Sequence, residues 1–203
     1  MFSILSGAIV ISLLHALIPN HWLPAIAIGR KENWSLKEIT NVTLICALAH
    51  GFSTILIGVA LAFLGAKLDD EFTHFEIVAP LTLIVIGLIF IYRHHNHKHF
   101  HINDDVKKKR SKTAIILALV FAMFLSPCME IEAYFLLAGS ISKSLVVFIA
   151  IMYLVITTTG MVLLVRFAYK GLLKLNWHSL EHNAGIITGL TLVVTGIITY
   201  FIH

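Results

Sequence analysis

The sequence predicts an all-α polytopic membrane protein with six transmembrane helices. Of its 203 residues, 58% are hydrophobic and only 13% are charged, whereas soluble domains carry about 25% charged residues. Long segments such as Ile77 to Ile91 and Ala114 to Phe124 contain no charged residue. A chain inside lipid must satisfy its backbone polar groups internally, which a helix does. Lipid-spanning helices therefore explain both the composition and the long apolar segments.

Apolar segments separated by charge clusters define the six helices in order. The expected spans cover residues 3–28, 38–66, 76–92, 112–138, 144–168 and 184–202. They form two three-helix halves, 1–92 and 112–203, joined by a histidine-rich basic loop at 93–111. Because each half has an odd number of spans, the second half enters the membrane from the opposite side, as in transporters with inverted repeats.

The distribution of basic residues predicts the orientation. Of the 15 lysines and arginines, only Lys67 and Lys143 lie in the even-numbered connections. Cytoplasmic connections carry the excess of positive charge, so the odd-numbered connections are expected in the cytoplasm and both termini outside. Attraction to anionic membrane lipid accounts for the net charge of +4, and no nucleic-acid partner is expected.

Prolines are expected to break the first helix of each half. The first span contains His15-Ala16-Leu17-Ile18-Pro19-Asn20-His21, and the fourth contains Leu125-Ser126-Pro127-Cys128. On an unbroken helix His15 and His21 would lie about 120° and about 9 Å apart. A break at Pro19, with Asn20 capping a new helix near His21, lets both imidazoles converge. A break at Pro127 would likewise let Cys128 and Glu130 turn toward a single face.

Polar residues at mid-span mark the candidate site. An ionisable side chain at the bilayer centre costs about 2.5 to 3.5 kcal/mol, so each one is a functional candidate. The expected metal ligands are His15, His21, His50, Cys128, Glu130 and Glu132, with Asn20, Cys46 and Thr158 in secondary positions. Imidazole, thiolate and carboxylate suit a divalent transition-metal ion such as nickel, cobalt, zinc or iron. The alternatives are a hydrogen-bonded structural role for His50 and Glu132, and helix packing for the threonines at 157–159.

A dense run of histidines follows the third span. His94, His95, His97, His99 and His101 all belong to the predicted cytoplasmic loop. Imidazoles this close together bind zinc, nickel or copper loosely and exchangeably. The loop is therefore either a collector of metal ions, which favours export, or a solvated linker.

The segment from His15 to His21 resembles the signature of the nickel/cobalt transporter (NicO) family, which has histidine, four residues and then aspartate-histidine. That family belongs to the LysE-type transporter superfamily. The resemblance implies a six-span transporter of the bacterial inner membrane, with nickel or cobalt as substrate and with His15 and His21 handling the metal. Asn20 stands where the family has aspartate, which removes a negative charge.

Two other functions are compatible with the sequence. Ser126-Pro127-Cys128 resembles the proline-cysteine break of thiol-reductant transporters of the cytochrome-c-biogenesis (CcdA) type, which implies a membrane oxidoreductase using Cys46 and Cys128. That family has one cysteine in the first span of each half, whereas Cys46 lies in the second span. A membrane metalloenzyme is the third hypothesis, but the spans lack a His-Glu-x-x-His motif. A homo-oligomer is left open.

Overall fold

The computed structural model describes residues 2–66, 111–126, 128 and 130–171, with scattered positions within 81–92 and 186–200. These residues form helices and no strand. The helices are α1 (Phe2–Leu17), α2 (Pro19–Lys31), α3 (Leu36–Gly65), α5 (Lys112–Phe124), α6 (Glu132–Ile141) and α7 (Lys143–Tyr169). The predicted loop at 93–110, with its five histidines, lies outside the described residues, as do most positions of the predicted spans 76–92 and 184–202.

Three helical stretches of the described chain are long and apolar enough to cross a membrane. They are Ile4–Lys31, Leu36–Leu64 and Lys143–Tyr169, which agree with the predicted spans 3–28, 38–66 and 144–168. The predicted span at 112–138, with its expected interruption near Leu125 to Cys128, forms two shorter apolar helices, α5 and α6. Six spans and two inverted halves remain predictions.

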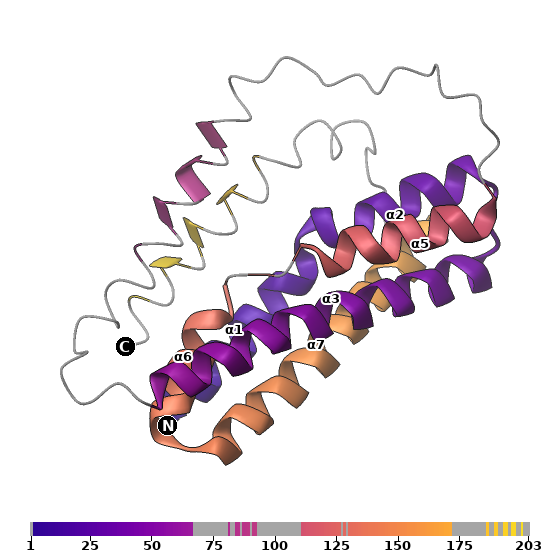
Figure 1. Cartoon of the computed structure of the whole chain (residues 1–203). Coiled ribbons are helices and arrows are strands. Elements are labelled where there is room, and N and C mark those ends of the chain that lie inside the picture. The colour runs from indigo at the N-terminus through magenta and orange to yellow at the C-terminus, as the bar shows by residue number, and fades with distance from the viewer. Residues whose placement is uncertain are drawn as a thin grey trace.

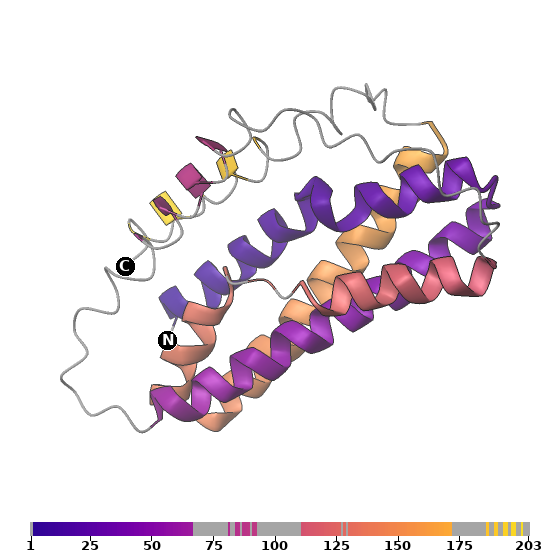
Figure 2. The ribbon, with the colours of Figure 1, turned by 45° about the horizontal axis from the view of Figure 1, so that its top comes forward.

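Two long helices and two interrupted ones form the bundle (Figure 1). The long helices α3 and α7 run antiparallel, and the interrupted pair α1–α2 runs in the opposite direction to the pair α5–α6. Figure 2 shows α1 and α2 following one another on one side of α7, with α5 beside α3. The sequence of an interrupted helix followed by a long one therefore occurs twice in the described chain.

Serine residues fix where three of the helices begin. The Ser35 hydroxyl accepts a hydrogen bond from the Glu38 backbone N–H, and the Glu38 carboxylate accepts one from the Ser35 N–H at 2.7 Å. Ser111 caps α5 and Ser142 caps α7 in the same way, each accepting a backbone N–H at 3.2 Å. Caps of this kind stabilise a helix by about 1 kcal/mol each. Lys112 also forms an ion pair with Glu38, which joins the first turns of α3 and α5.

Small residues let α6 lie directly against α3. A Cβ atom added to Gly139 would lie 2.1 Å from the Ala62 carbonyl oxygen, and one added to Gly58 would lie 2.4 Å from the Phe135 ring. No larger side chain fits at these two positions without moving the helices. Close backbone approach at small residues is typical of helix packing in membranes.

The described positions of the predicted third and sixth spans also meet at glycines. A Cβ atom added to Gly87 would lie 2.6 Å from the Gly189 carbonyl oxygen, and the reciprocal distance is also 2.6 Å. The two segments therefore pack against each other at this point.

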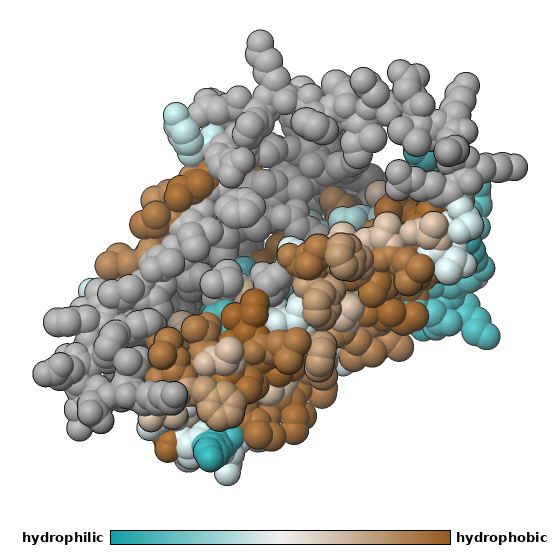
Figure 3. All heavy atoms as spheres, in the orientation of Figure 1, coloured by the Kyte–Doolittle hydropathy of each residue, from teal (hydrophilic) through white to brown (hydrophobic). Residues whose placement is uncertain are grey.

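The bundle is apolar on the outside and polar at its centre. Leu13, Phe52, Phe121 and Ile151 are all more than half exposed. On the face that Figure 3 shows, apolar side chains cover most of the coloured surface, and hydrophilic residues gather towards its ends. The buried polar residues are Ser12, His15, His21, Thr43, His50, Ser53, Thr54, Glu130, Glu132 and Thr157. This distribution is the reverse of a soluble protein and is typical of a chain surrounded by lipid.

Two apolar clusters enclose these polar residues along the bundle. The first includes Trp22, Ile26, Ile39, Met123 and Val165. The second includes Ile4, Ile11, Phe135, Ile149 and Tyr153. Along both α3 and α7 one cluster precedes the buried polar residues and the other follows them, so the polar centre lies at mid-length.

Candidate metal centre

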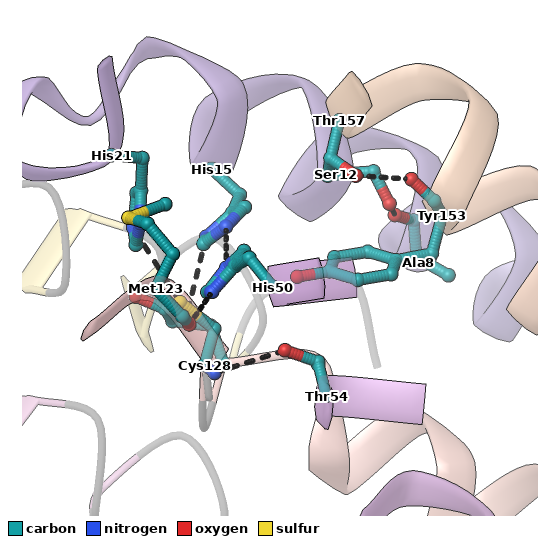
Figure 4. A network of polar contacts seen from close by, with 11 residues as sticks. Ala8, Ser12, His15, His21, His50, Thr54, Met123, Cys128, Tyr153 and Thr157 are labelled. Carbon is teal, nitrogen blue, oxygen red and sulfur yellow. Dashed lines mark hydrogen bonds and ion pairs between the residues drawn. The ribbon is translucent and has the colours of Figure 1, made fainter. Parts of the chain in front are cut away.

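Four potential metal ligands converge in the interior of the bundle. His15, His21, His50 and Cys128 each offer one ligand atom, and these four atoms all lie within 4.8 Å of one another. All four residues are buried. They come from four separate segments: the end of α1, the start of α2, the middle of α3 and the connection between α5 and α6 (Figure 4). This set, called the quartet below, could hold one metal ion.

The break between α1 and α2 brings His15 and His21 together. Ile18 alone separates the two helices, and its extended backbone (φ −63°, ψ 120°) turns the chain. The Ile18 N–H donates to the His15 carbonyl at 3.1 Å, and the His21 N–H donates to the Ile18 carbonyl at 3.3 Å. The two imidazole centroids are consequently 4.3 Å apart. The predicted convergence at the proline break is confirmed.

Pro19, rather than Asn20, starts the second helix. The N-cap position belongs to Ile18, no side chain caps the helix, and Pro19 stands in its first turn. Proline is well suited there, because the N–H that it lacks would have no partner in the helix. The prediction that Asn20 caps the new helix was therefore wrong. The Asn20 side chain lies outside the described structure.

The second break places the sulfur ligand. Helix α5 ends at Phe124 and α6 begins only at Glu132. Between them, the Cys128 N–H donates to the Thr54 hydroxyl at 3.2 Å, and the Cys128 Sγ lies 3.5 Å from the His21 Nε2. Pro127 itself lies outside the described residues, so its predicted role in this break stays a prediction.

Backbone and carboxylate partners orient two of the imidazoles. The His50 Nδ1 lies 3.3 Å from the Met123 carbonyl oxygen. Because a carbonyl can only accept, this nitrogen carries the proton and Nε2 presents its lone pair to the quartet. The His15 Nδ1 lies 3.3 Å from the Glu130 carboxylate. Metal-binding histidines commonly have such a partner on the outer ring nitrogen, which fixes the ring and the inner lone pair.

The His15 and His50 rings meet edge to edge. Their planes differ by only 8°, and their centroids are 5.3 Å apart, but their Nε2 atoms are separated by 3.1 Å. A nitrogen separation so much shorter than the centroid separation excludes face-to-face stacking. Both inner nitrogens therefore point to the centre of the quartet, and a small tilt of the rings would direct both lone pairs to a common point.

The two predicted acidic ligands have different positions. Glu130 contacts the outer nitrogen of His15 and also forms a hydrogen bond with Cys128, so it lies beside two quartet members without being one of the four ligand atoms. Glu132 is 3% exposed, and neither of its carboxylate oxygens has a hydrogen-bond partner among the described residues. Glu132 does not belong to the quartet.

The secondary candidates do not join the quartet either. Cys46 is buried in the first apolar cluster, and both Cys46 and Cys128 are free thiols. Thr157 is the fully buried member of the threonine triplet, and its hydroxyl donates to the Tyr153 carbonyl at 2.7 Å, as expected of helix back-bonding. The Thr158 hydroxyl has no hydrogen-bond partner in the described part of the chain.

Sequence reasoning missed Thr54 and Tyr153. Thr54 supports Cys128, and the Tyr153 ring centroid lies 5.7 Å from that of His15. Both residues are fully buried. Thr54 follows His50 by one helical turn and Tyr153 precedes Thr157 by one, so each shares a helix face with a residue already identified. That helical spacing is the signal that could have revealed them.

Comparison of the chain with protein-family models, with curated proteins and with solved structures finds no match. The functional argument therefore depends on the geometry of the quartet and on the apolar helices that surround it.

Proposed function

We propose that this protein is a membrane transporter of a divalent transition-metal ion, which the quartet binds as its substrate at mid-depth in the bilayer. The single observation that carries the proposal is that three imidazoles from helical stretches long enough to cross a membrane converge within 4.8 Å with one thiol from the connection between α5 and α6. Burying so many polar groups in lipid is costly, so they are expected to serve a function.

The helix breaks support transport over a static structural site. Transporters commonly build the substrate site from interrupted helices, because the break frees backbone groups and lets neighbouring segments move. Two quartet residues flank the first break, and a third lies within the second. The opposite directions of α1–α2 and α5–α6 suit an inverted repeat. In this proposal the two apolar clusters open in turn. The ion can then reach the quartet from one side of the membrane at a time.

Export is the proposed direction. The proposal places the end of the bundle that carries Arg30, Lys31, Lys112 and Arg166 in the cytoplasm, following the predicted charge asymmetry. The histidine-rich loop would then collect ions on the same side. A transporter with this arrangement would lower the cytoplasmic concentration of its metal.

The test is metal flux into proteoliposomes of the purified full-length chain, with an ion indicator trapped inside. The wild type should show saturable flux, and His21→Ala should abolish it, because this change removes a ligand from the quartet. Cys46→Ser is the matched control and should retain flux. Flux that survives His21→Ala unchanged would disprove the proposal.

The same cysteine variants decide the oxidoreductase alternative. A thiol relay requires both Cys46 and Cys128, so Cys46→Ser would abolish thiol exchange across the membrane. Metal transport requires only Cys128. A wild type that exchanges thiols but binds no metal would replace the transporter proposal with the relay.

A further inference from the structure

We infer that the quartet is a tetrahedral site that selects zinc over nickel and over oxygen-preferring cations. The inference rests on the proposed function and specifies its substrate. It follows from three features of the described residues: the chemistry of the donor atoms, the distances between them and the directions from which they approach.

The donor set contains three imidazole nitrogens and one sulfur. No carboxylate oxygen is among the four, because Glu130 contacts the outer nitrogen of His15 and Glu132 lies apart. Magnesium, calcium and manganese prefer oxygen ligands and retain bound water. The quartet residues are at most 9% exposed, so few water molecules can complete a six-coordinate shell. The donor chemistry thus favours a four-coordinate ion that accepts nitrogen and sulfur.

Two distances agree with a tetrahedron. Zinc bonds of about 2.05 Å to nitrogen and about 2.3 Å to sulfur give tetrahedral edges of about 3.4 Å between nitrogens and about 3.6 Å between nitrogen and sulfur. The structure has 3.1 Å between the His15 and His50 Nε2 atoms, and 3.5 Å between the His21 Nε2 and the Cys128 Sγ. The two pairs share no atom, so they are opposite edges of the same polyhedron. A square plane would require edges of about 2.9 Å between nitrogens and about 3.1 Å between nitrogen and sulfur, so the nitrogen–sulfur distance favours the tetrahedron and the nitrogen–nitrogen distance lies between the two geometries. The remaining pairs lie within 4.8 Å, so the side chains would draw together as they bind the ion.

The three imidazoles do not all approach the quartet with the same ring inclination. The His15 and His50 planes differ by only 8°, whereas the His21 ring is inclined by 44° to His15 and by 37° to His50. His21 also comes from a different helix and carries the sulfur partner on its own side. Nickel in nitrogen sites prefers square-planar or octahedral geometry, whereas zinc has no such preference and accepts the geometry that the protein offers.

Cobalt(II) provides the direct test, because it occupies zinc sites and reports its coordination in its visible spectrum. Cobalt added to the purified full-length protein should give the intense visible bands of a tetrahedral ion and a near-ultraviolet thiolate-to-cobalt band. Zinc should displace the cobalt at a concentration at least about tenfold lower than nickel requires. Cys128→Ser should lose the thiolate band, whereas Cys46→Ser should keep it. If a variant fails to fold, the wild-type spectrum and the competition with nickel still test the inference.

The outcomes separate the two claims. A weak spectrum of six-coordinate cobalt, or nickel that displaces cobalt as readily as zinc does, would overturn the tetrahedral zinc site and leave metal transport standing. Retention of the thiolate band in Cys128→Ser would overturn the assignment of the sulfur ligand. A folded protein that binds neither cobalt nor zinc would overturn both this inference and the proposed function.

Discussion

The two interruptions in the bundle differ in how their backbone groups are satisfied. Between α1 and α2 the interruption is a single residue, Ile18, and its hydrogen bonds are made by its own neighbours, His15 and His21. Between α5 and α6 it extends from Leu125 to Ile131. The Leu125 and Ser126 N–H groups bond locally to α5 carbonyls, and two α3 side chains add contacts at the Met123 carbonyl and the Cys128 N–H. The first break is therefore satisfied by local bonds, whereas the second combines local bonds with tertiary contacts.

Helix α3 consequently connects the two breaks. Its His50 contacts His15 through one ring nitrogen and the end of α5 through the other. Thr54, one turn further along α3, supports Cys128. Changes at His50 should therefore reach both breaks, whereas changes at Thr54 should reach only the second. The predictions below test this difference, from the largest expected effect to the smallest.

The largest effect is expected from His50→Ala. This change removes a ligand and also removes the His50 contact of the Met123 carbonyl, which then keeps the Ser126 N–H at 3.3 Å, so it affects both breaks. Changes to the partners behind metal ligands typically cost about 10-fold to 100-fold in affinity, and the loss of a ligand should exceed that range. Zinc affinity measured by competition with a chelator checks it. A loss below tenfold would show that His50 is a structural histidine.

Glu130→Gln should have the next largest effect. It keeps the size of the side chain but removes the charge that faces the outer nitrogen of His15, so we expect zinc affinity to fall about 10-fold to 100-fold. The cobalt spectrum should remain tetrahedral, because no ligand is lost. A change in the number of ligands seen in that spectrum would show that Glu130 itself binds the metal.

Thr54 offers a test confined to the second break. Thr54→Val removes the acceptor of the Cys128 N–H and leaves a buried donor unpaired, which costs about 1–3 kcal/mol. Thermal unfolding in detergent should occur at a lower temperature, with a smaller loss of zinc affinity than Glu130→Gln causes. Thr54→Ser keeps the hydroxyl and is the control. Identical behaviour of the two variants would mean that this hydrogen bond contributes little.

The smallest effect on zinc affinity is expected from Glu132→Leu. Because neither carboxylate oxygen has a hydrogen-bond partner among the residues that the structure describes, burying this group is expected to destabilise the fold, and an apolar replacement should raise the unfolding temperature. Affinity should not change, since Glu132 lies outside the quartet. Loss of flux with unchanged affinity would instead place Glu132 on the path of the ion.

Sequence periodicity and hydropathy predicted much of the described fold. The long apolar segments gave α3 and α7 nearly complete, and Pro19 gave the first break. Hydropathy did not separate α5 from α6, because it measures the cost of transfer into lipid and residues 125–131 are largely apolar. The signal for an interruption there was the break expected at Pro127. The start of α2 was misjudged by two residues, because the helix begins at Pro19 and not after a cap at Asn20.

The sequence predicted which residues form the candidate site, but not the role that each residue has in it. Four of the six expected ligands form the quartet, because each is a polar residue at mid-span. That Glu130 supports His15 and that Thr54 supports Cys128 depends on contacts between distant segments, which spacing along one helix cannot reveal. The predicted third and sixth spans and the histidine-rich loop remain predictions.

The contact of Gly139 with Ala62 limits how the bundle can move. With no side chain between the two backbones, α6 and α3 cannot slide past each other without collision, and Phe135 against Gly58 holds the same pair a turn and more away. We therefore expect these two helices to move together. If the proposed transport opens the quartet by a movement of α1–α2 against them, a crosslink from α1 to α6 should arrest it while one from α3 to α6 should be harmless.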